Sequence, residues 1–402
     1  MSKVAILGYG VVGSGVYEIL KNSADCVCKN AGKSIEVKYI LDIRDFDSHP
    51  EKHLFTKDFG DILADKEVDI VAEVIGGATV AYEFTKAALS AGKNVVTSNK
   101  ELVATYGTEL LKLAADNGVS YLFEASVGGG IPLIHPMHRC LTANNIVRIM
   151  GILNGTTNYI LTSMLKDNIT FEDALKDAQK KGYAEANPAA DVEGIDACRK
   201  IAILSSLAYG KSINVGDIHT EGITKITLTD AKYAAKAGYV VKLIGYSDIT
   251  DGKAEVFVGP MLIPTCMPLS KVDDVFNAAV VRGDNVGDVM MYGRGAGMLP
   301  TASAVVADII DIATGSCKMA PITWIGPDME VKKFDDTVSK YYVRAGANDL
   351  SAAKTLFEGA EFICGTDEGE IAFITEKELH SQFTEKISGM SDVKNYIKVF
   401  DE

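Results

Sequence analysis

Short apolar runs alternate with stretches of helical composition along the first 125 residues. The runs predict strands at 3–7, 35–41, 68–74, 94–97 and 120–124. Helices are expected between them, at about 14–20, 81–91 and 105–117. Strands that alternate with helices form a parallel sheet with right-handed crossovers, and such a sheet binds ligands at the carboxyl ends of its strands. The pattern therefore predicts an α/β fold with a Rossmann-type parallel sheet.

The pattern changes after Pro132. A helix at about 136–144 leads to an apolar strand at 146–153, and the polar cluster 154–159 has the composition of a helix start. Taken alone, this cluster is a turn and helix cap, although its small polar side chains also suit a ligand. A further helix is expected over 192–204. We expect a mixed α+β domain in the middle of the chain.

The last 70 residues contain a third pattern. Strands are expected near 339–345, 361–364, 371–375 and 396–400, and helices near 351–358 and 376–387. The predicted order is βαββαβ.

A glycine-rich motif follows the first predicted strand directly. It consists of Gly8, Gly10 and Gly13, with Val11 and Val12 between the last two. The first glycine allows a tight turn, the second lets a pyrophosphate approach the backbone, and the third lets helix and strand pack closely. Between a first strand and a first helix, this spacing predicts a dinucleotide site.

The end of the second strand should select the cofactor. Asp42 suits the ribose hydroxyls of NAD, whereas Arg44 suits the 2′-phosphate of NADP, and Lys57 adds a positive charge. NADP is favoured and NAD stays open. Arg44 can also be an ordinary loop arginine beside Asp45.

Asp196 and Lys200 are four residues apart on a predicted helix and should touch. An exposed pair of this spacing is common and stabilises little. The same helix stripe continues to Ile203 and Leu207, which are apolar, so the pair should lie at the edge of a buried face. A structural ion pair and an active-site pair both remain open at this point.

Composition limits the class of protein. With 402 residues and 47% hydrophobic content, the chain can form two or three domains. A net charge of −14 argues against a nucleic acid or an anionic membrane as a partner. Seven scattered cysteines suggest neither a disulfide framework nor a metal site, so we expect a reducing cytoplasm. The chain begins with a core strand, and no apolar run is long enough to cross a bilayer.

The chain resembles the homoserine dehydrogenases in six motifs that occur in one order: GYGVVG at 8–13, TSNKELVA at 97–104, FEASVGGGIP at 123–132, GILNGTTNYIL at 151–161, GYAEANPAADVEGIDACRK at 182–200 and GRGAGMLPTASAVVADI at 293–309. The resemblance implies interconversion of L-homoserine and L-aspartate 4-semialdehyde with a nicotinamide cofactor. Because the chain starts at the first strand of the dehydrogenase, we expect an enzyme without an aspartate kinase domain.

The resemblance also implies roles for particular residues. Lys200 would be the acid and base, Asp196 would orient it, and Lys100 would position substrate and nicotinamide. Two nearby ammonium groups would lower each other's pKa. The implied substrate residues are Glu185, Asp191, Asn154, Thr156 and Tyr183. Further cofactor contacts are implied at Thr97, Lys100 and Gly295.

The stretch FEASVGGGIP resembles the family's site for a monovalent cation, which we expect to be sodium. Its oxygen ligands would come from the Glu124 side chain or carbonyl and from the carbonyls of Val127, Gly129 and Ile131. A glycine-rich turn without an ion is the alternative.

Three domains are expected on these grounds. Residues 1–135 with about 297–320 would bind the dinucleotide, 136–296 would bind substrate and form a homodimer or tetramer, and 335–402 would be an ACT-like domain. The loop 348–351 lacks the Pro-Gly usual at the ACT ligand site. A tail that binds a threonine effector and a tail that is purely structural or dimer-forming therefore both remain open.

Two other functions are less well supported. Aspartate-semialdehyde dehydrogenase would need a cysteine nucleophile, and none of the cysteines has a recognisable nucleophile setting. A redox sensor that binds NAD(H) without catalysis would not need the group formed by Glu185, Asp191, Asp196 and Lys200.

Overall fold

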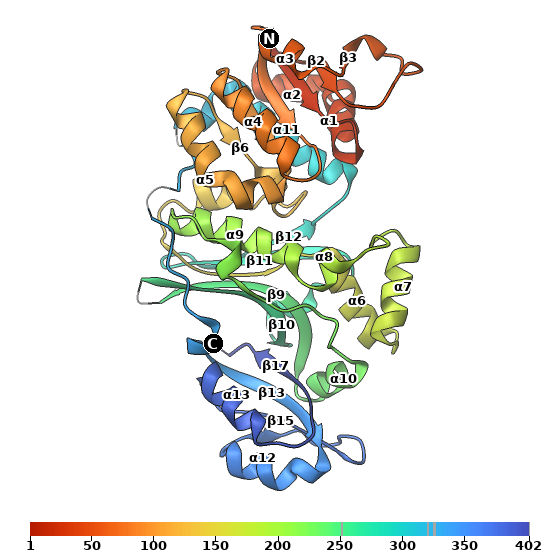
Figure 1. The fold of residues 1–402 in the computed structure, drawn as a ribbon, viewed down its shortest axis with the longest axis vertical. Coiled ribbons are helices and arrows are strands. Elements are labelled where there is room, and N and C mark those ends of the chain that lie inside the picture. The colour runs from red at the N-terminus through yellow and green to blue at the C-terminus, as the bar shows by residue number, and fades with distance from the viewer. Residues whose placement is uncertain (251, 320, 325–326, 402) are drawn as a thin grey trace. The chain divides into compact units, whose positions relative to one another are not determined.

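The computed structural model describes residues 1–250, 252–319, 321–324 and 327–401, and its chain forms two compact units. The first unit contains Met1–Ile146, Ala202–Val215 and Gly283–Met329. The second contains Val147–Ile201, Gly216–Arg282 and the described residues from Glu330 onward. Figure 1 labels the elements of both.

The first unit is built on a parallel sheet with the strand order β3-β2-β1-β4-β5-β6. The strands are β1 (Ser2–Leu7), β2 (Ile35–Leu41), β3 (Phe55–Thr56), β4 (Val68–Glu73), β5 (Asn94–Thr97) and β6 (Tyr121–Leu122). Their apolar runs are buried, as expected for parallel strands covered on both faces. The predicted Rossmann-type sheet is confirmed.

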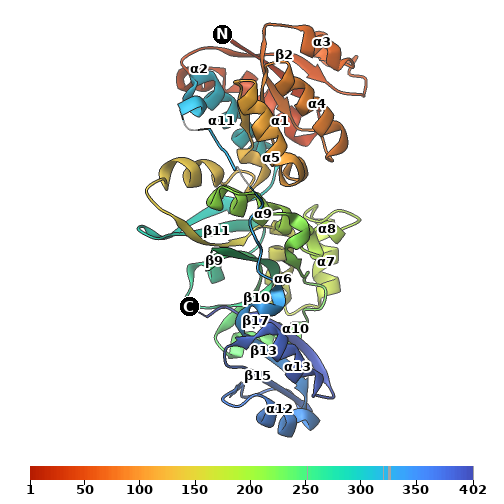
Figure 2. The same ribbon diagram turned by 60° about the vertical axis from the view of Figure 1, so that its left-hand side comes forward.

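Helices cover this sheet. They are α1 (Val11–Asn22), α2 (Ala24–Ala31), α3 (Phe59–Ala64), α4 (Thr79–Ser90), α5 (Lys100–Asp116) and α11 (Met298–Thr314), which follows β12 (Gly287–Arg294). The chain returns late to place α11 against α1 and α2 (Figure 2). A Cβ on Gly15 would lie 3.0 Å from the Cβ of Ala302, so this glycine allows the close approach of α1 and α11.

Two helix predictions in the first unit differ from the structure. The helix expected from about 105 begins at Lys100, because the side chain of Asn99 accepts a hydrogen bond from the Leu102 N–H and caps the helix start. The helix expected over 136–144 is a single π-helical turn, Pro136–Cys140, closed by the Leu141 N–H on the Pro136 carbonyl.

The second unit contains a mixed sheet with the strand order β11-β7-β9-β10-β17-β13-β15-β14. Its first part is formed by β7 (Ile146–Ile152), β9 (Tyr239–Thr250), β10 (Lys253–Pro264) and β11 (Phe276–Gly283), with β8 (His219–Thr220) beside β10. The helices are α6 (Gly155–Lys166), α7 (Phe171–Lys180), α8 (Ala189–Val192), α9 (Ile195–Tyr209) and α10 (Leu228–Lys236). The α9 helix continues beyond Ile201 into residues of the first unit.

The C-terminal elements extend the same sheet. They are β13 (Val338–Gly346), α12 (Leu350–Leu356), β14 (Glu361–Phe362), β15 (Glu370–Ile374), β16 (Glu378–Leu379), α13 (His380–Ser388) and β17 (Val393–Val399). Tyr341, Phe373 and Phe383 share one core, so α12 and α13 cover the same face of these strands (Figure 1). The predicted βαββαβ elements are present, with β16 added, and β17 pairs with β10.

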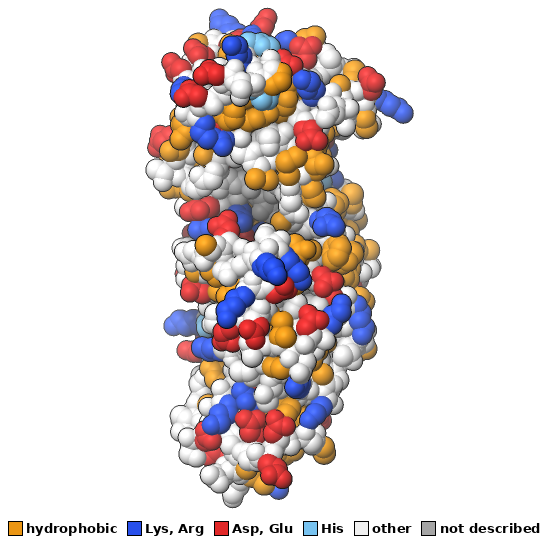
Figure 3. All heavy atoms as spheres, turned by 90° about the vertical axis from the view of Figure 1, so that its right-hand side faces the viewer, with side chains coloured by type: hydrophobic (Ala, Val, Ile, Leu, Met, Phe, Trp, Pro, Cys, Tyr) orange, Lys and Arg blue, Asp and Glu red, His pale blue; other side chains and the backbone are white. Residues whose placement is uncertain are grey.

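Three features relate to the expectations from composition: the distribution of surface charge, the length of apolar helices and the state of the cysteines. Acidic and basic side chains are intermingled over the face in Figure 3. Among the described helices, none is long and apolar enough to span a bilayer. No disulfide joins the described cysteines.

Candidate active site

The glycine motif has the geometry that a dinucleotide pyrophosphate requires. Gly8 has φ +97°, and a Cβ on Gly13 would lie 1.9 Å from the Gly8 carbonyl oxygen. A Cβ on Gly10 would meet nothing within 4 Å, so the space outside the backbone is open there. No described side chain caps α1, which starts at Val11 and Val12. Its first N–H groups can therefore bind an anion, and the motif fits NAD or NADP.

Asp42 and Arg44 form one compact group at the end of β2. The Asp42 carboxylate accepts hydrogen bonds from the Tyr9 N–H (2.8 Å), the Arg44 N–H (3.0 Å) and the guanidinium, whose Nη2 also donates to the Tyr9 carbonyl at 2.8 Å. These bonds hold the pKa of Asp42 well below its usual value. The Arg44 side chain remains 57% exposed, so the guanidinium can still meet a ligand.

Lys57 is paired with an acid. Its ammonium lies 2.6 Å from the Asp45 carboxylate, and both side chains are more than half exposed. A pair of this kind stabilises little and can open to a ligand phosphate.

The second unit brings together the lysine and two acids of the 182–200 motif. Lys200 Nζ donates to Asp196 Oδ2 at 2.8 Å and to the Leu153 carbonyl at 2.7 Å. Lys200 and Asp196 are buried, at 8% and 4% exposure. The predicted i, i+4 contact is present, and its burial excludes the reading of a solvated surface pair.

Asn154 connects this pair to Asp191. Its Nδ2 donates to Asp191 Oδ1 at 2.7 Å and to Asp196 Oδ2 at 2.9 Å, while its Oδ1 accepts from the Thr157 N–H at 2.8 Å and caps α6. The ordinary role of a helix cap and a place in the site are therefore combined in one side chain.

The other candidate substrate residues lie nearer the surface. Thr156 Oγ1 donates to the Tyr183 carbonyl at 2.7 Å. The Tyr183 ring is 44% exposed and lies edge-on to Tyr159. Glu185 is exposed on the segment before α8.

Two further candidates, Thr97 and Lys100, belong to the first unit. Thr97 is buried at the carboxyl end of β5, and Lys100 is the first residue of α5 and partly exposed. Asn99 lies between them, and its backbone N–H donates to Thr97 Oγ1 at 2.9 Å. Both candidates thus lie at the sheet edge where ligands bind to parallel sheets.

The glycine-rich stretch after β6 uses the Glu124 carboxylate for its own backbone. Glu124 Oε1 accepts from the N–H groups of Leu133 (2.6 Å) and Ile134 (3.0 Å), and Oε2 accepts from that of His135 (2.6 Å). Of the two cation ligands expected from Glu124, the carbonyl is the better candidate. A Cβ on Gly129 would lie 2.4 Å from the Gly295 carbonyl oxygen, so these two candidate residues are adjacent.

Sequence reasoning missed three groups around these candidates. They are the Leu153 carbonyl that accepts from Lys200, the Asn99 cap of α5, and Glu73, a fully buried acid at the end of β4. Glu73 had a visible signal, since it is an acid that ends an apolar strand. The Leu153 carbonyl had none, because any residue supplies a carbonyl.

Comparison with known proteins identifies the family. The model for "Homoserine dehydrogenase, NAD binding domain" matches residues 8–124, and that for "Homoserine dehydrogenase" matches residues 132–310. The homoserine dehydrogenase of Bacillus subtilis is 37% identical over 413 aligned positions, which cover 98% of this chain and 95% of the relative.

Solved structures agree. The crystal structure of a homoserine dehydrogenase from Thiobacillus denitrificans is 36% identical and has a TM-score of 0.92, covering 100% of this chain and 98% of that one. A hyperthermophilic archaeal homoserine dehydrogenase mutant in complex with NADPH is 31% identical with a TM-score of 0.67, covering 78% and 98%. With both family models matched along most of its length, the chain belongs to the homoserine dehydrogenase family.

Proposed function

We propose that the chain uses NADP and a buried lysine, Lys200, to interconvert L-homoserine and L-aspartate 4-semialdehyde. The reaction and the NAD(P)-binding domain follow from the family. The single observation that supports Lys200 as acid and base is its burial with Asp196, Asn154 and the Leu153 carbonyl around it. A nicotinamide, when bound, supplies or accepts the hydride.

Lys200 exchanges the proton of the substrate oxygen. In the reducing direction its ammonium donates a proton to the aldehyde oxygen, and in the oxidising direction its amine accepts the hydroxyl proton. Asp196 and the Leu153 carbonyl hold Nζ from two sides and so fix its direction. Asn154 donates to the same Asp196 oxygen, which keeps that carboxylate in place.

The acids of the second unit are proposed to bind the substrate's ammonium group. Asp191 is held by Asn154 at 2.7 Å, close to Asp196. Glu185, Thr156 and Tyr183 complete the proposed substrate residues from the neighbouring surface. In the first unit, Lys100 is proposed to position substrate and nicotinamide, and Gly295 to approach the nicotinamide. Thr97 is buried and is proposed to act on the cofactor site through the hydrogen bond that it accepts from the Asn99 N–H.

NADP is the proposed cofactor because the acid that would select NAD is already paired. Both Asp42 oxygens accept hydrogen bonds from Arg44, and the exposed guanidinium is suited to a 2′-phosphate. Lys57 can add a second positive charge. The NADPH complex of the archaeal relative supports the same choice.

A monovalent cation, sodium, is proposed at the glycine-rich stretch after β6. Carbonyl oxygens suit a hard cation, and the candidates are those of Glu124, Val127, Gly129 and Ile131. Gly128 and Gly129 have φ of +76° and +55°, so the backbone turns sharply at this stretch, and the Ile131 N–H donates to the Gly128 carbonyl across the turn. The cation would stabilise this turn beside Gly295.

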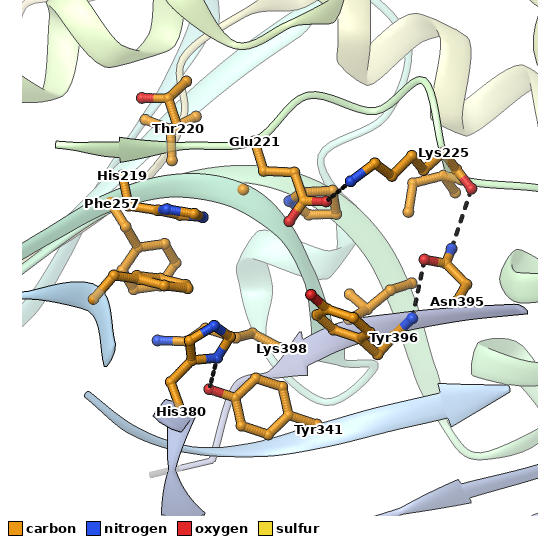
Figure 4. Close-up of a pocket in the computed structure, with 16 residues that line it drawn as sticks. His219, Thr220, Glu221, Lys225, Phe257, Tyr341, His380, Asn395, Tyr396 and Lys398 are labelled. Atoms are coloured by element: carbon orange, nitrogen blue, oxygen red, sulfur yellow. Dashed lines mark hydrogen bonds and ion pairs between the residues drawn. The ribbon is translucent and has the colours of Figure 1, made fainter. Parts of the chain in front are cut away.

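The C-terminal elements are proposed to form an ACT-like domain that binds threonine. A cavity of about 230 Å³ lies between β8, β10 and the strands β13 and β17. Figure 4 shows Glu221 and Lys225 on one side of it, with Tyr341 and His380 opposite. Glu221 and Lys225 form an exposed pair of 3.3 Å, which can open so that each side chain binds one charge of a small amino acid.

Assembly and location complete the proposal. A homodimer or tetramer formed through the middle sheet is proposed, and light scattering of the purified protein would test it. A reducing cytoplasm is the proposed compartment, because no disulfide joins the described cysteines.

One assay tests the main proposal. Purified protein is given L-homoserine with NADP or NAD in parallel, with sodium or potassium present, and absorbance of the reduced nicotinamide is followed while threonine is titrated. Faster turnover with NADP supports the cofactor choice, and inhibition by threonine supports the C-terminal site. Equal or faster turnover with NAD would contradict the proposed role of Arg44.

A further inference from the structure

Glu73 is a buried carboxylate that the proposed mechanism does not use. It ends β4, is 0% exposed, and follows Ile70, Val71 and Ala72, which are also fully buried. Burying an ionised carboxylate is costly unless hydrogen bonds replace its water. Such a group at the carboxyl end of a parallel strand needs an explanation beyond packing.

Each oxygen of Glu73 accepts a hydrogen bond from a different segment. Oε2 accepts from the Thr97 hydroxyl at 2.5 Å, and Oε1 accepts from the Ile75 N–H at 2.7 Å. Thr97 stands opposite Glu73 in the register of β4 and β5. The carboxylate therefore joins the ends of two neighbouring strands to the loop that follows the first of them.

The same bonds continue to the start of α5. Thr97 Oγ1 accepts from the Asn99 N–H at 2.9 Å. The Asn99 side chain donates to the carbonyls of Ile75 (3.1 Å) and Gly77 (2.7 Å), and its oxygen accepts from the Leu102 N–H at 3.1 Å. Asn99 is the cap of the helix whose first residue is Lys100. One connected set of bonds thus links Glu73 to the Leu102 N–H in the first turn of α5, the helix that begins at Lys100.

We propose that Glu73 is a positioning residue for hydride transfer, which acts through Thr97 and Asn99 to fix the loop 75–77 and the first turn of α5 with Lys100. The inference rests on the proposed role of Lys100 at the nicotinamide. Glu73 has no exposed surface, so it touches neither cofactor nor substrate. Glu73 instead fixes the orientation of Lys100 and of the loop 75–77, which are proposed to lie at the nicotinamide.

The proton on Glu73 decides how these bonds run. When Glu73 is ionised, the Thr97 hydroxyl donates to it, and the Thr97 oxygen is left to accept from the Asn99 N–H. A proton on Glu73 adds a second donor between Glu73 and Thr97. The Thr97 hydroxyl then no longer needs to donate to Glu73, and its orientation toward the Asn99 N–H is less well fixed. Burial raises the pKa of Glu73 to about 7, against the lowering effect of its bonds to Thr97 and Ile75. The groups that face the Glu73 carboxylate are Thr97, Asn99 and the Ile75 N–H. The charge of Glu73 also raises the pKa of Tyr121 on β6, in addition to the larger effect of burial.

Glu73→Gln is the main test, measured in the direction that reduces aspartate semialdehyde. In that direction Lys200 must be protonated, so lower pH does not impair it. A fall of kcat below about pH 7 is assigned to Glu73 if it disappears in Glu73→Gln. We expect Glu73→Gln to lower kcat about tenfold at pH 8, to abolish this fall, and to change the Kd for NADPH less than threefold. Asp69→Asn, an exposed acid on the same strand, is the matched control and should leave kcat and its pH profile unchanged.

Thr97→Val removes the same bond from the other side. It should lower kcat by a similar factor, and the double variant should be no slower than either single variant, because both interrupt one path. An unchanged kcat and pH profile in Glu73→Gln overturns the proposal, as does a loss of NADPH affinity or folding in proportion to the loss of kcat. Lys100→Ala is measured beside them, since normal kcat in that variant would refute the role of Lys100 itself.

Discussion

The guanidinium of Arg44 holds the carboxylate of Asp42 at two points, with Nε 2.9 Å from Oδ1 and Nη2 2.8 Å from Oδ2. The two residues that favour opposite cofactors are therefore not independent. Arg44 neutralises the acid that would otherwise repel a 2′-phosphate, and its own position is fixed by that acid.

Arg44→Ala should weaken NADPH binding about 100-fold and NADH binding less than threefold. The variant removes the charge-assisted bonds proposed to the 2′-phosphate and leaves Asp42 uncompensated beside it. Fluorescence titration with both reduced cofactors measures the two Kd values. Lys57→Ala is the control of smaller effect, because Lys57 is exposed and paired with Asp45. A similar loss for NADH and NADPH would assign the selection to Asp42.

Local sequence patterns predicted several features of the candidate site. The glycine spacing before α1 and the i, i+4 spacing of Asp196 and Lys200 depend on a few consecutive residues, and the structure shows both geometries. The capping of α6 by Asn154 is local as well. Each of these features depends only on the geometry of a single turn or helix, so the spacing of residues along the chain predicts it.

The remaining site features depend on residues that are distant in sequence. Lys200 bonds to the Leu153 carbonyl, 47 residues away, and Glu73 pairs with Thr97, 24 residues away. The expected Glu124 side-chain ligand is used by three backbone N–H groups nine to eleven residues later. No local pattern predicts which partner a buried polar group meets once strands and loops come together.

Lys200→Ala should lower kcat by several orders of magnitude and leave the Kd for NADPH within about threefold. The variant removes the proposed proton transfer and polarisation of the substrate oxygen, while the proposed dinucleotide contacts at Gly8–Gly13 and Arg44 stay. Stopped-flow and equilibrium titration give the two quantities. The exposed Lys232→Ala on α10 is the control. Near-normal kcat in Lys200→Ala would remove this lysine from the mechanism.

Arg344→Met should destabilise the protein by about 3 kcal/mol, measured as the free energy of unfolding in urea. Arg344 on β13 is bonded to Asp230 at 2.8 Å and to Glu370 at 3.0 Å, and Asp230 is fully buried at the start of α10. Removing one partner leaves a buried carboxylate without its cation. Lys340→Met on the same strand, whose pair with Asp401 is partly exposed, should cost far less. Equal costs for the two variants would contradict this account.

Glu73→Gln should make the protein more stable than the wild type above pH 7, although it slows catalysis. Glu73 has a pKa of about 7 in the folded protein and about 4.3 when unfolded. Because the folded value is the higher one, the protonated carboxyl favours folding at low pH, and this contribution is lost as the pH rises from about 4.3 through 7. At 1.36 kcal/mol per pKa unit the full difference is roughly 4 kcal/mol, of which roughly 3 kcal/mol falls between pH 4.5 and 8. A glutamine stays neutral throughout, so the stability of the Glu73→Gln variant relative to the wild type should rise by this amount between pH 4.5 and 8, measured by urea unfolding at each pH.

Asp69→Asn should show no such rise. Parallel curves for Glu73→Gln and the wild type would mean that Glu73 does not change its charge across this range, and the pH dependence assigned to it in catalysis would fall with that result.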